Sequence, residues 1–347
     1  MAEGKGVDEA RVVPWLEANV AGFEGPATFA LIAGGHSNLT YRVTDANGVK
    51  YVLRRPPLGH VLATAHDMGR EHKIISALGP TPVPVPPALG YCDDLTVNDA
   101  PFYVMGFVEG TIIRDANIAK TAFTTEQRRR AGESLIDVMA ALHAVDVDAV
   151  GLGDLGRKEG YIERQLKRWF KQVKGSQELT KRELPDVDFV HEWLEKHVPE
   201  QGTAGIVHGD YRLDNCMIGV DGTIAAVLDW ELCTLGDTMA DVGLLTVYWN
   251  DPDDAAASLL TAPTMVDGFP RRAELLARYA EVSGRDVSNV DYYTAFGYWK
   301  LACIVEGVYA RYQAGVMGTT DPAAFEGFRT NVERLAASAR SAVERMG

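Results

Sequence analysis

The hydrophobic pattern changes character near residue 110, and this change limits the fold more than any other feature of the sequence. Before it, turn signals separate short apolar runs that predict β-strands at residues 27–32, 39–43, 51–55 and 102–107. Asn47-Gly48 predicts a hairpin between the second and third runs. Met68–Leu78 predicts one helix, which Gly79-Pro80 ends. The first part of the chain is therefore expected to form a mostly antiparallel sheet with one helix.

Helical spacing dominates after residue 110. Thr124 and Gln127 are typical of a capping box, and apolar residues at helical spacing follow them: Leu135, Val138, Met139 and Leu142. A second amphipathic helix is expected over residues 161–174, and Asp221-Gly222 predicts a hairpin between residues 216–220 and 223–228. We therefore expect an α+β fold with two lobes. Residues 1–108 would form the sheet lobe, and residues 109–347 a larger, mainly helical lobe.

Composition argues against several classes of function. A net charge of −14 disfavours broad binding of nucleic acid, and any anionic ligand must be held locally. No stretch approaches the roughly 18 uninterrupted apolar residues of a membrane span, and the N-terminus lacks the pattern of a signal peptide. The four cysteines form no Cys-x-x-Cys pair, so neither a disulfide framework nor a zinc site is indicated. We expect a cytoplasmic protein with no evident obligate protein partner.

Residues 206–231 carry the candidate catalytic groups. They contain His208-x-Asp210-x-x-x-x-Asn215, and Asp229 follows the predicted hairpin. Phosphoryl transfer requires a carboxylate that orients the attacking hydroxyl, and then an amide and a carboxylate that hold Mg²⁺. The alternative is that these residues only form turns, which Asp and Asn favour. A histidine in such a loop is more often a buried hydrogen-bonding group than a proton carrier.

The chain resembles the aminoglycoside phosphotransferase and choline kinase-like family, a branch of the protein-kinase-like fold. The segments that carry the resemblance are GGHSNLTYRV, YVLRRPP and HGDYRLDN, within residues 31 to 245. They are similar to the kinase-like module that eukaryotes fuse to acyl-CoA dehydrogenases. The resemblance implies that ATP and Mg²⁺ are the cofactors. It also implies that Asp210 is the catalytic base, that Asn215 and Asp229 are metal ligands, and that His208 organises the loop.

A glycine-containing loop joins the first two predicted strands and is the candidate phosphate-binding loop. Gly34 and Gly35 would let backbone N–H groups approach phosphate oxygens, and Ser37 and Asn38 would add polar contacts. The loop lacks the full G-x-G-x-x-G of protein kinases. A simple hairpin linker would explain two glycines equally well.

Strand alternation places Val52 and Arg54 on the same face of the third predicted strand. Arg54 stands where the kinase pattern has a phosphate-pairing lysine, and a guanidinium can grip phosphate oxygens with two hydrogen bonds. Glu71, on the predicted helix 68–78, resembles the glutamate that pairs with that cation. A glutamate on a solvated helix face is the alternative.

Residues 102–110 match the hinge between the lobes of a kinase. The resemblance implies that the adenine edge meets the Gly106 carbonyl and the Val108 amide. Met105 would line the back of the nucleotide pocket, although a methionine in an apolar strand is more often core.

Two departures from the protein-kinase pattern indicate a small-molecule kinase. Gly209 stands where regulated protein kinases have arginine, and Asp229-Trp230-Glu231 replaces Asp-Phe-Gly, with no long activation segment before Gly236. In the family the helical lobe binds the substrate. The candidate substrate wall is therefore residues 291–313, and the residues chosen from it are Tyr292, Trp299 and Arg311. An aromatic stripe at helical spacing is more often core.

The predicted function is an ATP- and Mg²⁺-dependent transfer of the γ-phosphoryl group to the hydroxyl of a small molecule. The alternatives are a non-catalytic nucleotide-binding module and a kinase that acts on proteins. Helix 161–174 has a basic side, formed by Arg164, Lys167, Arg168, Lys171 and Lys174. This side favours an anionic or acyl-bearing acceptor over amino sugars, although such charge runs usually meet only water.

Overall fold

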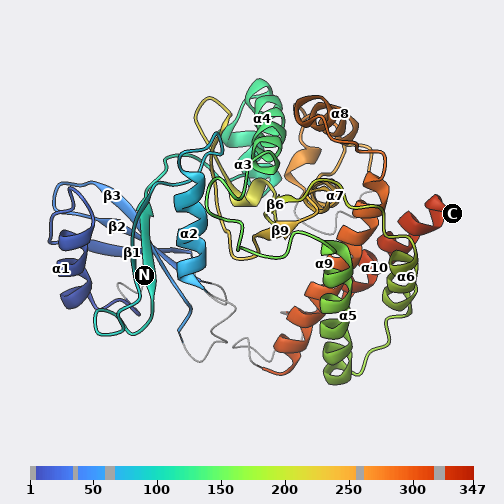
Figure 1. The fold of residues 1–347 in the computed structure, drawn as a ribbon, viewed down its shortest axis with the longest axis horizontal. Coiled ribbons are helices and arrows are strands. Elements are labelled where there is room, and N and C mark those ends of the chain that lie inside the picture. The colour runs from blue at the N-terminus through green and yellow to red at the C-terminus, as the bar shows by residue number, and fades with distance from the viewer. Residues whose placement is uncertain (1–4, 34–37, 59–66, 255–261, 316–324) are drawn as a thin grey trace.

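The computed structural model describes residues 5–33, 38–58, 67–254, 262–315 and 325–347. They form the predicted α+β fold of two lobes, with a sheet lobe beside a larger helical lobe (Figure 1). We keep the proposed boundary after residue 108, because the last strand of the sheet ends at Gly106 and the first helix beyond it begins at Ala116. No helix in these described ranges is both long and apolar enough to cross a membrane.

The N-terminal lobe is a five-stranded antiparallel sheet with the order β1-β2-β3-β5-β4. Its strands are β1 (Thr28–Ala33), β2 (Leu39–Thr44), β3 (Lys50–Arg55), β4 (Ala88–Cys92) and β5 (Phe102–Gly106). Its helices are α1 (Glu9–Asn19) and α2 (Met68–Leu78). The predicted strands and α2 are confirmed, whereas α1 and β4 were not predicted. Pro14 lies inside α1, and Gly90 lies inside β4, so both elements contain residues that usually interrupt such patterns.

The two faces of this sheet contact different partners. Leu53 and Val104 pack with Leu16 of α1 in a core that belongs to the N-terminal lobe. Val52 and Met105 point to the other face and join the core that continues into the helical lobe. The alternation of β3 thus separates a structural face from a face that looks into the space between the lobes.

The C-terminal lobe is mainly helical. Its helices are α3 (Ala116–Ala122), α4 (Thr125–His143), α5 (Tyr161–Thr180), α6 (Pro185–Lys196), α7 (Met239–Tyr248), α8 (Arg272–Ser283), α9 (Val290–Gln313) and α10 (Glu326–Met346). Two short 3₁₀ helices are η1 (Leu213–Asn215) and η2 (Pro263–Met265). The predicted capping box is present at the start of α4, where the Gln127 N–H donates to Thr124 Oγ1 and the Thr124 N–H donates to Gln127 Oε1.

Two small antiparallel pairs hold the predicted catalytic segment in this lobe. They are β6 (Gly205–Val207) with β9 (Thr234–Gly236), and β7 (Cys216–Ile218) with β8 (Ile224–Val227). The second pair is the predicted hairpin, in shorter form. The four cysteines are free and buried, as their spacing indicated.

Close contact between α7 and α9 brings a residue of α9 to the catalytic loop. A Cβ at Gly243 of α7 would lie 2.4 Å from the backbone carbon of Tyr293, so only glycine permits this approach without a shift. The contact brings Lys300 of α9 within reach of the loop that follows β6, where its ammonium donates to the Gly209 carbonyl.

Candidate active site

Asp210 lies in the loop after β6, and its carboxylate is held by two donors. The Tyr248 hydroxyl donates to Asp210 Oδ1 over 2.7 Å, and Asn215 Nδ2 donates to Asp210 Oδ2 over 2.9 Å. Asn215 Nδ2 also donates to the backbone carbonyl of Asp210 over 2.8 Å. Because these bonds use the amide nitrogen of Asn215, its carbonyl oxygen is the atom left to bind another group. The arrangement fixes both the carboxylate and the amide.

His208 is completely buried and organises the loop around Asp210. Its Nε2 is 3.0 Å from the Leu228 carbonyl, and its Nδ1 accepts from the Asp210 N–H over 3.3 Å. These partners require a neutral ring that carries its proton on Nε2. The ring therefore links the catalytic loop to the end of β8, where Asp229 follows, and it does not reach a cavity as a free base.

Asp241 of α7 supports the same loop and was not predicted. Its carboxylate accepts the N–H groups of His208 and Gly209 over 2.6 and 2.8 Å. Burial alone would raise the pKa of Asp241, but the hydrogen bond and charge of His143 hold it below its ordinary value. A buried, ionised carboxylate thus fixes the backbone on the N-terminal side of Asp210.

Asp229 and Arg54 connect the two lobes through an ion pair. One guanidinium nitrogen of Arg54 lies 2.5 Å from Asp229 Oδ1, and Nε of Arg54 lies 3.1 Å from Glu71 Oε2. Burial lowers the pKa of Arg54, but Glu71 and Asp229 outweigh this and raise it above its ordinary value. Asp229 has a φ of 64°, in the left-handed region that few side chains adopt. Strained backbone conformations of this kind cluster at functional sites, where they orient a side chain at a cost in conformational energy.

Glu71 is buried on α2 and faces the pair rather than solvent. Its carboxylate accepts from Asn38 Nδ2 over 2.9 Å and from the Tyr103 hydroxyl over 3.0 Å. Burial raises the pKa of Glu71, and the charge of Arg54 opposes this effect. The alternative of a solvated glutamate is therefore wrong.

Helix α2 is also anchored to the helical lobe. A terminal nitrogen of Arg70 donates to the carbonyls of Leu155 and Cys233 over 2.7 and 2.9 Å. Lys73 and Asp154 add an exposed ion pair of 2.6 Å. The helix that carries Glu71 is thus fixed to the C-terminal lobe.

A cavity of about 320 Å³ lies between the sheet and β7–β8. Its lining includes most of the predicted nucleotide and metal residues that the structure describes: Arg54, Met105, Gly106, Val108, Asn215 and Asp229. Val52, Ile75, Met217 and Val227 add apolar walls. The combination of an apolar slot with charged groups at one end suits a nucleotide. Gly34, Gly35 and Ser37 lie outside the described residues, and Asn38 donates to Glu71 from a buried position.

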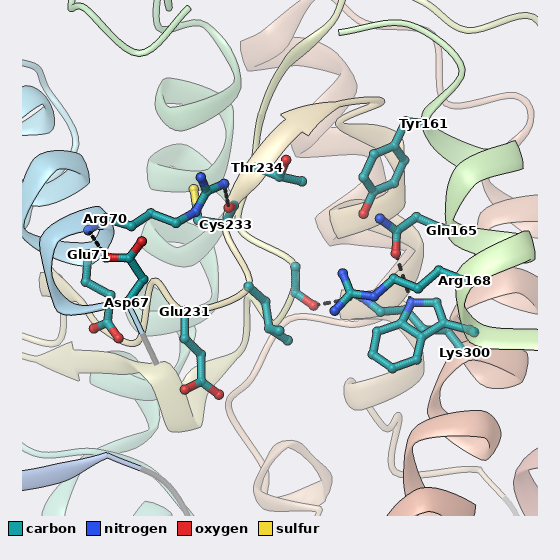
Figure 2. Close-up of a pocket in the computed structure, with 13 residues that line it drawn as sticks. Asp67, Arg70, Glu71, Tyr161, Gln165, Arg168, Glu231, Cys233, Thr234 and Lys300 are labelled. Carbon is teal, nitrogen blue, oxygen red and sulfur yellow. Dashed lines mark hydrogen bonds between the residues drawn. The ribbon is translucent and has the colours of Figure 1, made fainter. Parts of the chain in front are cut away.

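A second cavity of about 220 Å³ lies on the other side of the catalytic loop (Figure 2). Its lining is largely polar: Asp67, Arg70, Glu71, Tyr161, Gln165, Arg168, Trp169, Gly209, Glu231, Leu232, Cys233, Thr234 and Lys300. Burial, together with the charge of Asp229, raises the pKa of Glu231 to about 7. Gly209 precedes Asp210, so this cavity reaches the backbone of the catalytic loop, although the Asp210 side chain does not line it.

None of the three residues predicted for the substrate wall lines either cavity. Trp299 is fully buried, donates to the Val187 carbonyl and stacks on His191. Tyr292 is buried and donates to the Leu194 carbonyl. Arg311 is exposed near the end of α9 and lines neither cavity. Tyr292 and Trp299 form core contacts with α6, and Lys300 is the α9 residue that lines the second cavity. We therefore carry Lys300, and not Tyr292 or Trp299, into the proposed site.

The donor atoms fit a magnesium site that ATP would complete. Asn215 and Asp229 supply an amide oxygen and a carboxylate on the wall of the first cavity. In the part of the chain that the structure describes, no three His, Cys, Asp or Glu side chains are grouped as a metal cage. Mg²⁺ is commonly held by one or two protein oxygens together with phosphates and water, so this small set suits it.

Comparison with known proteins identifies the family. A model described as the phosphotransferase enzyme family matches residues 28–281, which is most of both lobes. The chain belongs to this family. The match confirms the resemblance found in the sequence, and it supports a phosphotransferase as the general class of activity.

Relatives of this family member agree with the assignment. It is 34% identical over 333 residues to a probable acyl-CoA dehydrogenase, IBR3, of Arabidopsis thaliana, and the match covers 90% of the chain but 40% of that relative. A solved structure from Ralstonia eutropha, assigned to the aminoglycoside phosphotransferases, is 31% identical, with a TM-score of 0.83 and coverage of 97% and 98% of the two chains. Choline kinase of Cryptosporidium parvum has the same fold, with a TM-score of 0.68, 12% identity and coverage of 98% and 96%.

Proposed function

We propose that this protein transfers the γ-phosphoryl group of ATP to a hydroxyl of a small molecule, with Mg²⁺ as cofactor. One observation carries the proposal. Asp210 accepts a hydrogen bond from Asn215, which lines the first cavity together with Arg54 and Asp229, and it directly follows Gly209, which lines the second cavity. A nucleotide in the first cavity and an acceptor in the second would meet at the Asp210 carboxylate. Positioning of this kind is the main requirement of phosphoryl transfer.

Each polar residue has a distinct proposed role. Asp210 orients the acceptor hydroxyl and accepts its proton. Asn215 and Asp229 hold Mg²⁺, which when bound neutralises the charge of the phosphates. Arg54 binds phosphate oxygens and is positioned by Glu71. His208 acts through the loop, because its ring is buried and both of its nitrogens have partners.

Backbone positions near the hinge have proposed roles in holding the base. Gly106 and Val108 line the apolar end of the first cavity with Met105, where an adenine edge would meet main-chain groups. Gly34, Gly35, Ser37 and Asn38 stay proposed phosphate contacts. The cytoplasm likewise stays the proposed compartment.

A non-catalytic nucleotide-binding module is the second candidate, because arginine replaces the usual lysine. Arg54 nevertheless makes the expected pair with Glu71, which supports retention of the catalytic arrangement. Slow hydrolysis of ATP that depends on Mg²⁺ would separate the two functions. We expect such hydrolysis, and we expect it to be stimulated by one class in a screen of amino sugars, choline-like amines, sugars and hydroxyacyl thioesters. Nucleotide binding without hydrolysis or transfer would favour the module, and phosphorylation of lysate proteins alone would favour a protein kinase.

The hydroxyl of Tyr248 is expected to contribute to turnover by orienting Asp210. Tyr248→Phe removes one hydrogen bond to a charged group and keeps the ring that lies against the Arg212 guanidinium. A bond of this type contributes about 1.5–3 kcal/mol, so we expect kcat to fall roughly tenfold or more with KM for ATP unchanged. Steady-state kinetics measures both constants.

Tyr292→Phe is a matched control for this prediction. It also removes a buried tyrosine hydroxyl, but the partner of that hydroxyl is the Leu194 carbonyl of α6, and neither residue lines the two cavities. We expect it to lower the melting temperature and to leave kcat unchanged. Equal values of kcat in the two variants would contradict the role of Tyr248.

A further inference from the structure

The second cavity is bounded by walls of different charge. Figure 2 shows Arg168 of α5 and Lys300 of α9 together on one side, with Arg70 and Glu71 of α2 and the N-cap residue Asp67 on the other. Glu231 lies between β8 and β9 and also lines the cavity. The α5 and α9 side therefore presents two cations without a carboxylate among the residues that line it.

Lys300 is a buried lysine whose ammonium contacts the catalytic loop. Its exposed fraction is 5%, and its ammonium donates to the Gly209 carbonyl over 3.0 Å. Within the described ranges no carboxylate lies within ion-pair distance of its ammonium. An ammonium has three N–H donors, and a buried cation is costly unless charged or polar groups compensate it. Burial lowers the pKa of Lys300, and the charges of Asp241 and Asp210 oppose this effect. The cavity thus contains a cation with unused donors one residue from Asp210.

Arg168 is the second cation on this side. Its guanidinium lies 5.0 Å from the ring centroid of Trp169, and no carboxylate pairs with it among the described residues. Other basic residues of α5 are engaged elsewhere, because Lys174 pairs with Asp188 and Arg164 donates to the carbonyls of Arg157 and Glu159. Of the predicted basic side of this helix, Arg168 alone lines the cavity.

The carboxylates of the cavity do not neutralise these two cations. Glu71 is paired with Arg54, and Asp67 caps α2 by accepting the Arg70 N–H. Arg70 itself donates to two neutral carbonyls. Glu231 forms no ion pair with Arg168 or Lys300. An incoming anion would therefore meet two cationic donors that form no ion pair with the residues that the structure describes.

We propose that the acceptor is a small hydroxyl compound with a carboxylate or phosphate group, which Arg168 and Lys300 bind beside the catalytic loop. The inference rests on the proposed function and adds its substrate class. Because Lys300 contacts the residue before Asp210, the anionic group and the reacting hydroxyl would lie a few bonds apart. The γ-phosphorus of ATP forms its new bond to that hydroxyl oxygen, the bond to the bridging oxygen of ADP breaks, and the hydroxyl proton passes to Asp210.

Paired compounds with and without an anionic group test this proposal. The pairs are 3-hydroxybutyrate with 3-hydroxybutyramide, and glycerol 3-phosphate with glycerol. Binding is measured by calorimetry with the first cavity saturated by Mg-ADP, and transfer is measured as ADP release from ATP. We expect the anionic member of at least one pair to bind and react better, and the pair that responds distinguishes carboxylate from phosphate recognition.

Variants on α5 and α9 test whether the preference for the anionic compound arises in the second cavity. Loss of a charge-assisted hydrogen bond predicts that Arg168→Ala weakens binding of the anionic compound roughly tenfold or more. Lys167→Ala removes the same charge from the adjacent exposed position and should change binding less than twofold. Lys300→Met should weaken binding like Arg168→Ala, with thermal unfolding used to confirm that the variant is folded.

Two results would overturn the proposal. One is equal binding of the paired compounds by the unmodified protein, and the other is equal loss in Arg168→Ala and Lys167→Ala. Hydrolysis of ATP without an added acceptor is measured in the same samples. Hydrolysis that persists in the unmodified protein while the anionic compounds fail would reject the substrate class and leave the proposed function standing.

Discussion

Replacing Asp210 with Asn is expected to reduce phosphoryl transfer by roughly 10²–10⁴-fold, the usual contribution of general base catalysis, and to preserve binding of Mg-ATP. The variant keeps the shape of the side chain and its bonds from Tyr248 and Asn215 can be retained in part. It removes the group that accepts the proton of the acceptor. Calorimetry with a non-hydrolysable ATP analogue measures binding, and ADP release measures turnover.

Asp229→Ala provides the comparison, because this residue faces the first cavity and not the acceptor. We expect loss of both Mg²⁺-dependent binding and turnover. The change also removes the partner of Arg54 across the lobes, so the folded state must be checked by thermal unfolding. If Asp210→Asn bound the analogue no better than Asp229→Ala, the assigned roles of these two carboxylates would be wrong.

The second large effect is expected at Arg54. Arg54→Ala should lower kcat/KM for ATP roughly 10- to 150-fold, which corresponds to about 1.5–3 kcal/mol for a charge-assisted hydrogen bond. It also leaves Glu71 buried without its cation, so the free energy of unfolding should fall. Arg54→Lys restores a cation at this position and should recover part of both losses. Kinetics with varied ATP and urea unfolding measure the two effects.

The adjacent Arg55 provides the matched control. Its side chain points to the opposite face of β3, where it is buried and contacts the Gly6 carbonyl and Asp99. Arg55→Ala should therefore lower the free energy of unfolding and leave kcat/KM for ATP nearly unchanged. A larger kinetic loss at Arg55 than at Arg54 would show that the guanidinium of Arg54 does not bind phosphate.

Local signals predicted four of the five strands of the sheet, and helix α2, which border the first cavity. Asn47-Gly48 fixed the β2–β3 hairpin, and the ends of α2 followed from Gly79-Pro80 and the apolar spacing before it. The alternation of β3 predicted that Arg54 shares a face with Val52, and both residues line the first cavity. These features depend on residues close together in the chain, so a single sequence contains them.

The supporting contacts of the site could not be predicted in the same way. Tyr248 is 38 residues from Asp210, and Lys300 is 91 residues from Gly209, so no local pattern connects them. For α9, periodicity showed which aromatic residues share a face but not what that face contacts. Tyr292 and Trp299 contact α6 because α9 passes through the middle of the helical lobe, which only the packing of several helices determines.

The anchoring of α2 has a consequence for the time course of the reaction. Arg70 fastens this helix to carbonyls of the other lobe, and Glu71 already contacts Arg54. We therefore expect that helix α2 need not move inward before the first turnover, unlike the equivalent helix of a kinase in which that helix moves on activation. Progress curves should therefore start at full velocity without a lag, and preincubation with nucleotide should not alter the initial slope. The rate of phosphoryl transfer would then respond to a change in substrate concentration without delay.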